Sequence, residues 1–199
     1  MSSLFPLRPL QQHALDLLKS SIMAGEVKKL PPIDRLKQVL HYAPETGQFT
    51  RLLDPVSREC DRKRWAGKPA GKLDGGGYVE IFIDGARYKA HRIAWLFVTG
   101  EEPEFQIDHV NLKRDDNRWL NLRLATNQQN QVNTPLRKDN TSGYKGVVFV
   151  KECTSHPWLA QIQTHGRHRK LGYFKTREEA HARYCSELGK EFGEYARFK

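Results

Sequence analysis

The central part of the chain carries an acidic residue, a histidine and an amide at spacings that could support hydrolysis of a phosphodiester. Asp108 and His109 are adjacent, and Asn130 lies within the amide-rich run NQQNQVN. A neutral imidazole, with an ordinary pKa of about 6.5, can take the proton of an attacking water. Carboxylate and amide oxygens are hard donors that suit Mg²⁺ or Mn²⁺. The predicted chemistry is metal-assisted cleavage of a polyanion.

The flanking residues predict the local structure that would position these groups. Residues 105–110 and 121–125 have the pattern of short strands separated by a polar run, and Thr126 with Gln129 has the pattern of a capping box that begins a helix. The predicted order is strand, loop, strand, helix. Because adjacent strand residues point to opposite faces, Asp108 and His109 can share a site only if the strand bends there.

The region before this segment predicts helices and one hairpin. Asp84-Gly85 stands between two alternating runs, the strongest short hairpin signal, and an apolar helix follows until Gly100. The basic stretch 58–72 is predicted to be a loop, which either lies along DNA or is simply solvated. The expected elements are helices at 1–29, 33–42 and 91–98 and hairpin strands at 78–83 and 86–90.

From Gly143 onward the pattern predicts a small sheet backed by one helix. Strand-like runs span 144–150, 158–164 and 170–174. The helix begins at a second capping box, Thr176 with Glu179. The apolar side chains of Ala180, Tyr184 and Leu188 follow at helical spacing, so they should face the sheet.

The charge distribution makes a polyanion the leading partner. Lys and Arg number 33 against 23 Asp and Glu, for a formal charge of +10. Residues 1–100 hold 16 basic and 10 acidic side chains, and residues 141–199 hold 11 and 6, whereas residues 101–140 hold 6 and 7. The two basic flanking segments could bind phosphate groups, while the central segment holds a cation.

The hydropathy pattern and the cysteine content exclude several classes of protein. No apolar run approaches the roughly 20 residues of a membrane helix, and the first residues lack a secretory pattern. The 3 cysteines stand far apart, which argues against a disulfide framework and a cysteine-based zinc site. We expect a protein of a reducing cytoplasm with no membrane partner; the resemblance described next implies a bacterial or phage-infected host cell and association with the nucleoid.

Five short motifs in residues 36–133 resemble the HNH endonucleases, and more narrowly the His-Asn-Asn form found in phage homing endonucleases. The motifs are His91-Arg92-Ile-Ala-Trp95, Ile107-Asp108-His109, Asp116-Asn117-Arg118, Asn121-Leu122-Arg123 and Asn130. The resemblance implies His109 as the general base and Asn121 as the brace of the turn between two strands. It implies Asp108 and Asn130 as ligands of one Mg²⁺ or Mn²⁺ ion.

The resemblance does not assign a clear role to the first motif, which contains His91 and Arg92. His91 is either a phosphate contact or a packed structural residue, and Arg92 is a second candidate phosphate contact.

Residues 142–199 resemble the AP2 DNA-binding domain, which is frequently attached to HNH homing enzymes. The matching residues are Ser142–Val147, Trp158–Ile162, Leu171–Phe174, Thr176–Ala180 and Phe192–Ala196. The family lays its sheet in the major groove of DNA. The candidate DNA-binding residues are Lys145, Lys151, Trp158, Gln161, Gln163, Arg167 and Arg169. Val148 and Phe149 stand where many relatives carry arginine, which favours phosphate contact over base reading by the first strand.

These interpretations combine into one expected architecture. The fold class is α+β, with a ββα-metal (His-Me finger) nuclease core preceded by hairpin and helix elements, and a C-terminal three-stranded antiparallel sheet on one helix. The expected divisions are an extension at 1–30, the nuclease at 31–134, a linker at 135–141 and the DNA-binding domain at 142–199. Residues 7–15 also resemble the segment before the nucleotide-binding loop of superfamily 2 helicases, but no such loop follows.

The predicted function is hydrolysis of double-stranded DNA at a recognised site by a monomeric, homing-type HNH endonuclease. Nicking of one strand and cleavage of both strands stay open. The alternative is a non-catalytic DNA-binding regulator derived from such a nuclease.

Overall fold

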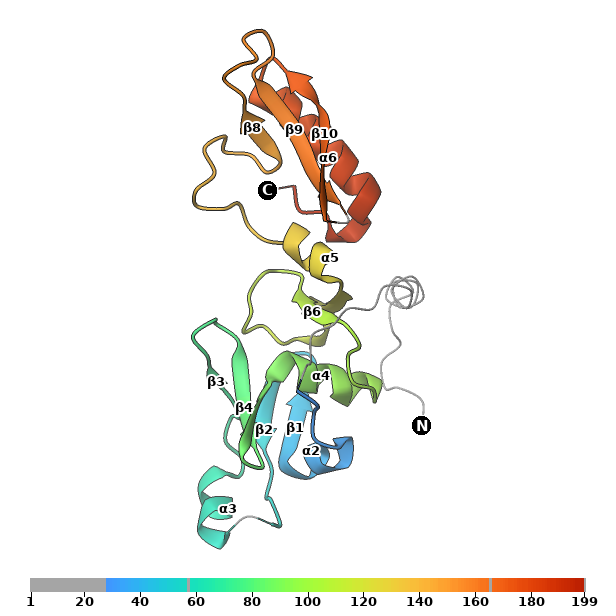
Figure 1. The fold of residues 1–199 in the computed structure, drawn as a ribbon. Helices are drawn as coiled ribbons and strands as arrows, with labels where there is room; N and C mark the ends of the chain where they lie inside the picture. Colours follow the sequence, from blue (N-terminus) through green and yellow to red (C-terminus); the bar gives the residue numbers. More distant parts are fainter. Residues whose placement is uncertain (1–27, 57, 165, 199) are drawn as a thin grey trace. The chain divides into compact units, whose positions relative to one another are not determined.

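The structure is a computed structural model that describes residues 28–56, 58–164 and 166–198 (Figure 1). Its elements form two compact units, the first ending at Ala125 and the second beginning at Thr126. The helix expected over 1–29 and the helicase-like segment lie outside the described residues, except for residues 28 and 29. Within the described ranges, no helix has the length and apolar character needed to cross a membrane.

The first described elements of this unit are helix α2 (Ile33–Val39) and the antiparallel strands β1 (Leu40–Ala43) and β2 (Gln48–Arg51). The helix predicted to reach Tyr42 was too long, because the chain becomes extended at Leu40. Leu40 and Tyr42 are buried on one face of the hairpin, and the Tyr42 ring stacks on Phe49 with centroids 4.6 Å apart. Burial of alternate residues in a strand pair therefore outweighed the helical spacing.

A second correction concerns the basic stretch predicted as a loop over 58–72. Helix α3 (Glu59–Trp65) occupies its first half. Glu59 and Lys63 lie one turn apart and form an ion pair of 2.7 Å, which supports a short helix rich in charged residues with good helix propensity.

The central sheet of the first unit has the order β3 (Lys72–Leu73), β4 (Val79–Ile83) and β5 (Ala86–Lys89), and it leads into helix α4 (Ala90–Thr99). The hairpin predicted at Asp84-Gly85 is confirmed, since Ile83 pairs with Ala86 and both turn residues have positive φ, 47° and 79°. Helix α4 packs Ile93 into the same core as Ile81, and it ends before Gly100 as predicted.

The last hairpin of the first unit consists of β6 (Gln106–His109) and β7 (Leu122–Ala125), with the 3₁₀ turn η1 (Trp119–Asn121) just before β7. The second strand was predicted to begin at Asn121, but the Asn121 N–H donates to Arg118 O at 2.9 Å and closes the turn. Ile107, Leu122 and Leu124 join the main core.

The second unit is a mixed α and β arrangement in which a helix covers a sheet. Its elements are α5 (Asn127–Val132), β8 (Val147–Phe149), β9 (Trp158–Thr164), β10 (Arg167–Phe174), α6 (Arg177–Phe192) and the 3₁₀ turn η2 (Gly193–Tyr195). The strands are antiparallel in the order β10-β9-β8. Both predicted capping boxes are confirmed, at Thr126 with Gln129 and at Thr176 with Glu179.

Helix α5 belongs to the second unit, although the sequence-based division placed residues 31–134 in one domain. Val132 packs against the buried cluster of Ile162, Tyr184 and Leu188. Gln128 Nε2 donates to Gln163 O at 3.2 Å. This packing follows from contacts between residues about 30 to 55 positions apart, which no local pattern indicates.

Candidate active site

Asp108 and His109 are the last two residues of β6. In the ladder, Asp108 lies opposite Arg123 and His109 lies opposite Leu122. Each of the two side chains is only 4% exposed. The strand keeps regular pairing through His109, so the bend expected between Asp108 and His109 does not occur within the ladder. The polar loop begins directly after these two residues.

The Asp108 carboxylate is bound by an arginine from the neighbouring strand. Arg123 Nε donates to Asp108 Oδ2 at 2.9 Å, and Arg123 Nη2 lies 2.7 Å from the same oxygen. Arg123 is itself 6% exposed. The pair therefore fixes the carboxylate in a nearly solvent-free position.

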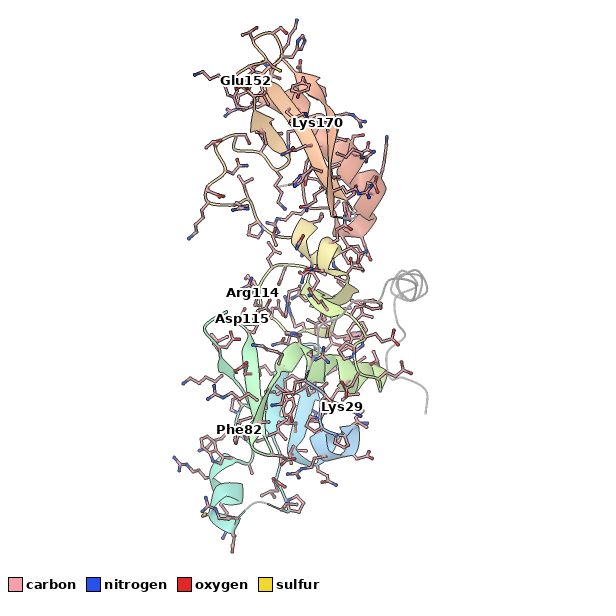
Figure 2. The ribbon with its side chains drawn as sticks, viewed as in Figure 1. Lys29, Phe82, Arg114, Asp115, Glu152 and Lys170 are labelled. Carbon is pink, nitrogen blue, oxygen red and sulfur yellow. The ribbon has the colours of Figure 1, made fainter. Side chains whose placement is uncertain are left out.

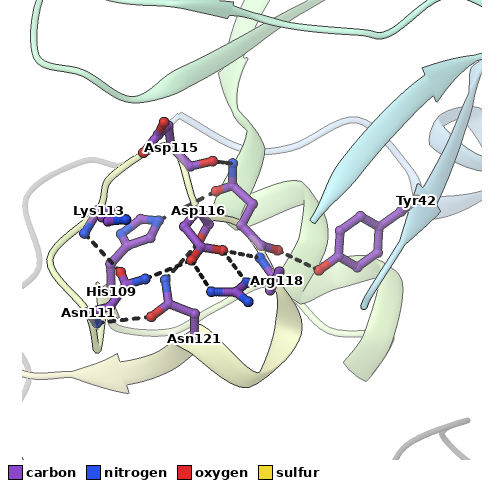
Figure 3. Close-up of polar contacts among 9 residues, drawn as sticks. Tyr42, His109, Asn111, Lys113, Asp115, Asp116, Arg118 and Asn121 are labelled. Carbon is purple, nitrogen blue, oxygen red and sulfur yellow. Dashed lines mark hydrogen bonds and ion pairs between the residues drawn. The ribbon is translucent and has the colours of Figure 1, made fainter. Parts of the chain in front are cut away.

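The His109 imidazole is set against the polar loop between β6 and β7. Its Nε2 lies 3.5 Å from Asn117 Oδ1, and Asn117 Nδ2 donates to Asp115 O at 3.1 Å (Figure 3). Burial lowers the pKa of His109, while the Asn117 contact and the carboxylates of Asp108, Asp116 and Asp115 act in the opposite sense. A neutral imidazole is the form that a general base requires.

Asn121 closes this loop on itself. Its Oδ1 accepts from the Asn111 N–H at 3.0 Å, and its Nδ2 donates to Asp116 O at 2.7 Å (Figure 3). The Asp116 carboxylate in turn accepts from Asn111 Nδ2 at 2.7 Å and from Arg118 Nη2 at 2.6 Å. These bonds join both ends of the loop, so the segment that carries Asn117 is held at several points.

The same loop is attached to the β1–β2 hairpin. Tyr42 Oη donates to Asn117 O at 2.7 Å (Figure 3). The Trp119 N–H also donates to Pro44 O at 2.9 Å. Gly47, with φ of +73°, lies so close that a Cβ built on it would overlap the backbone of Asn117 and Arg118. Sequence reasoning missed Tyr42, because it is 75 residues from its partner.

Two further rings lie beside His109. His91 is 8% exposed, and its ring centroid is 5.2 Å from that of His109. Tyr78, which the sequence did not single out, lies 5.4 Å from His91 and 6.0 Å from His109. Arg92, the second candidate phosphate contact, forms an ion pair with Glu102, and its Nη2 lies 3.6 Å from Glu102 Oε2.

Asn130 lies in helix α5 of the second unit, where it is half-buried and its N–H donates to Thr126 O at 3.0 Å. The capping box at Thr126 fixes the start of this short helix one turn before Asn130. Among the described residues, no three or more His, Cys, Asp or Glu side chains are grouped as a metal site would require.

Comparison with known proteins bears directly on this segment. Residues 88–132 match the family described as HNH endonuclease. The matched residues run from β5 to the end of α5 and include Asp108, His109, Asn121 and Asn130. The HNH match therefore coincides with the residues that the sequence selected for chemistry.

Individual relatives cover larger parts of the chain. An uncharacterized HNH endonuclease, L560, of Acanthamoeba polyphaga mimivirus is 30% identical over 118 residues, which are 58% of this chain and 59% of that protein. Protein 3.8 of Escherichia phage T7 is 29% identical over 112 residues, 49% of this chain and 91% of the phage protein. The chain thus spans little more than half of the mimivirus relative.

A solved structure of the HNH homing endonuclease I-HmuI, described for DNA binding and cleavage, is also similar. It covers 81% of this chain and 84% of its own, with 21% sequence identity and a TM-score of 0.36.

In the second unit, the predicted DNA-binding residues lie on different faces of the sheet. Ala160 and Ile162 pack toward α6, so the alternating residues Gln161 and Gln163 point to the opposite, open face. Lys170 of β10 pairs with Gln161 on that face and is exposed (Figure 2).

The other predicted DNA-binding residues are placed differently. Arg169 pairs with Ile162 and lies 2.7 Å from Glu187 Oε1 and 2.9 Å from Glu191 Oε1 of α6. Trp158 packs on Phe149 with centroids 5.0 Å apart, and Lys145 Nζ donates to Val132 O at 2.9 Å. Lys151 and Arg167 are exposed near the ends of strands.

Proposed function

We propose that this protein is a metal-dependent DNA endonuclease of the HNH homing type. The observation that carries the proposal is a buried His109, whose pKa is lowered by burial, at the start of a braced polar loop inside the HNH-matched segment. His109 accepts the proton of the attacking water. Asn117 and Asn121 hold the loop against which its ring is set.

The two proposed ligands, one from each unit, have the donor chemistry of a hard divalent cation. Asp108 offers a carboxylate oxygen and Asn130 an amide oxygen, and Mg²⁺ commonly takes one or two protein ligands and completes its shell with water and phosphate. When bound, one Mg²⁺ or Mn²⁺ ion would offset the negative charge that builds on the phosphate during cleavage. Arg123 keeps the Asp108 carboxylate in one orientation.

The second unit would supply DNA affinity as an AP2-like module. Its open face carries Gln161, Gln163 and Lys170, and the chain has a formal charge of +10. The partner is double-stranded DNA bound by one copy of the chain, in the cytoplasm of the host cell. Val148 and Tyr173 share the open face and add apolar contact area.

The decisive experiment is cleavage of supercoiled plasmid that carries candidate sites, with Mg²⁺ and with EDTA. A nuclease of this type produces open-circular or linear product only with the metal, and primer extension maps the break. His109→Ala should lower the rate by at least about 100-fold, the contribution of a general base, with DNA affinity unchanged. A DNA-binding regulator would bind the plasmid equally well with either side chain and cut it with neither.

A matched control is His41→Ala, since His41 is an exposed histidine on β1. Its cleavage rate should equal that of the wild type. Cleavage that persists in EDTA would rule out the metal-dependent mechanism.

A further inference from the structure

His109 belongs to a cluster of three rings drawn from three segments of the first unit. The imidazoles of His91 and His109 are perpendicular, with an interplanar angle of 90° and centroids 5.2 Å apart. Tyr78 completes the cluster at 5.4 Å from His91 and 6.0 Å from His109. Perpendicular packing places the edge of one ring on the face of the other, which is a favoured aromatic geometry.

Tyr78 is itself held firmly. The side-chain cations of Lys89 and Arg114 lie 5.2 and 5.0 Å from its ring centroid. The Tyr78 N–H donates to Asp74 Oδ1 at 2.8 Å, and the Asp74 carboxylate also binds Lys89. Arg114 Nη1 donates to Gly76 O at 2.9 Å, which ties the β6–β7 loop to the turn before β4 (Figure 2).

His91 makes an unusual member of this cluster. It comes from the first turn of α4, its Nδ1 is buried, and that atom has no hydrogen-bond partner in the described structure. Burial, followed by the proximity of His109, lowers the pKa of His91 to about 3, so its ring is neutral. A buried polar atom without a partner costs free energy, so this ring occupies its position at some cost to stability.

We propose that His91 is a positioning residue, whose ring packs edge-to-face against His109 and, with Tyr78, fixes the orientation of the general base. This rests on the proposed nuclease function. The contribution of His91 is geometric, and a ring of similar shape can replace it.

The test compares His91→Ala with His91→Phe, using single-turnover plasmid cleavage and DNA affinity. His91→Ala should lower the cleavage rate by about 100-fold, the loss expected when a reacting group is misplaced by about 1 Å. Its DNA Kd should stay at the wild-type value. His91→Phe keeps an aromatic ring and should recover most of the lost rate, whereas His41→Ala should behave as wild type.

Two results would overturn the proposal: a wild-type rate in His91→Ala, or a defect in His91→Phe as large as in His91→Ala. The second result would mean that a ring nitrogen of His91 acts directly. If His91→Ala fails to fold, Tyr78→Leu replaces it. Tyr78 is only half-buried, and removing its ring should slow cleavage without changing DNA affinity.

A second measurement does not depend on DNA cleavage. Nitrogen-15 resonances of the His109 imidazole should shift in His91→Ala and stay near their wild-type positions in His91→Phe. Unchanged resonances in a folded His91→Ala protein would refute the positioning role. Wild-type protein that does not cut DNA would instead refute the nuclease function, and the resonances would still decide whether His91 orients His109.

Discussion

Asp108 and Arg123 face each other across the β6–β7 hairpin, and both are nearly inaccessible to solvent. The Asp108 carboxylate accepts hydrogen bonds from the buried Arg123 guanidinium, and it is also the proposed ligand of the metal. Replacing Asp108 by asparagine or by alanine separates these two roles, because only asparagine keeps a side-chain oxygen. The proposed metal site requires the negative charge of Asp108, whereas Arg123 requires an oxygen atom that accepts its hydrogen bonds.

We predict that Asp108→Asn remains folded but loses metal-dependent cleavage, because the amide oxygen still accepts from Arg123 while the negative charge is gone. Asp108→Ala should lose about 3 kcal/mol of unfolding free energy, since it removes a partner from a buried charge. Urea unfolding followed by circular dichroism measures the difference. Equal stability of the two variants would contradict the role assigned to the pair.

Among the residues of the site, sequence alone identifies those whose chemistry and spacing are local. Asp108 and His109 could be selected from their chemistry, and the resemblance to HNH endonucleases added Asn121 at the other end of the same loop. Asn117 occurs in one of the recognised motifs, yet its position beside His109 depends on how the loop closes. Tyr78 could not be predicted, because it meets His109 only after two hairpins and a helix have packed.

At the scale of elements, the turn between β1 and β2 supports the loop that contacts His109. Gly47 has a positive φ and lies directly against the backbone of Asn117 and Arg118. Gly47→Ala should therefore lower stability by about 1–3 kcal/mol through backbone strain and should also slow cleavage. Thermal unfolding and plasmid cleavage measure the two effects.

A control for this substitution is Gly85→Ala, which also has a positive φ but has open space around the added Cβ. It should lose stability by strain alone and keep its cleavage rate after correction for the folded fraction. If Gly47→Ala retains wild-type cleavage, the β1–β2 turn does not support the site.

Adjacent residues of β10 offer a second test at this scale. Lys170 is on the open face of the sheet, whereas Arg169 binds Glu187 and Glu191 of α6. Lys170→Ala should weaken DNA binding and reduce the slope of log affinity against log salt by about 0.9, the value for one lost phosphate contact. Arg169→Ala should leave that slope unchanged and lower the melting temperature. The reverse result would place the DNA on the helix side.

The elements that the sequence predicted well carry their own local signal. The turn at Asp84-Gly85 and the capping boxes at Thr126 and Thr176 depend on residues within four positions of one another. The switch from helix to strand at Leu40 depends on pairing with Arg51, which lies beyond the turn. Helix α3 was missed because the whole basic stretch 58–72 was predicted as a loop, either along DNA or solvated, whereas Glu59 and Lys63 pair one helical turn apart.

At the scale of the whole molecule, the packing of α5 changes the expected result of a truncation. A chain that ends at Asn140 keeps Asp108, His109, Asn121 and Asn130, so sequence reasoning predicts slow cleavage. However, the truncation removes Ile162, Tyr184 and Leu188, against which Val132 packs. A helix of 6 residues is not stable alone.

We therefore predict that this truncated protein loses metal-dependent cleavage while its β6–β7 hairpin stays folded. Circular dichroism and the amide spectrum of residues 28–125 test the fold, and plasmid cleavage at high protein concentration tests the activity. Cleavage by the truncated chain would show that α5 forms without the C-terminal sheet. Its DNA affinity should also fall, because residues 141–199 carry 11 basic against 6 acidic side chains.

The boundary at Ala125 and Thr126 also bears on how such a gene could exchange parts. A crossover at this point would leave Asp108 and His109 in the parental chain and bring Asn130 in with the new C-terminal half. Recombinants that acquire a different C-terminal half would thus inherit one proposed metal ligand from the donor. Under the proposed metal site, a donor half without an oxygen-bearing side chain one turn after the Thr126 cap would give an inactive hybrid.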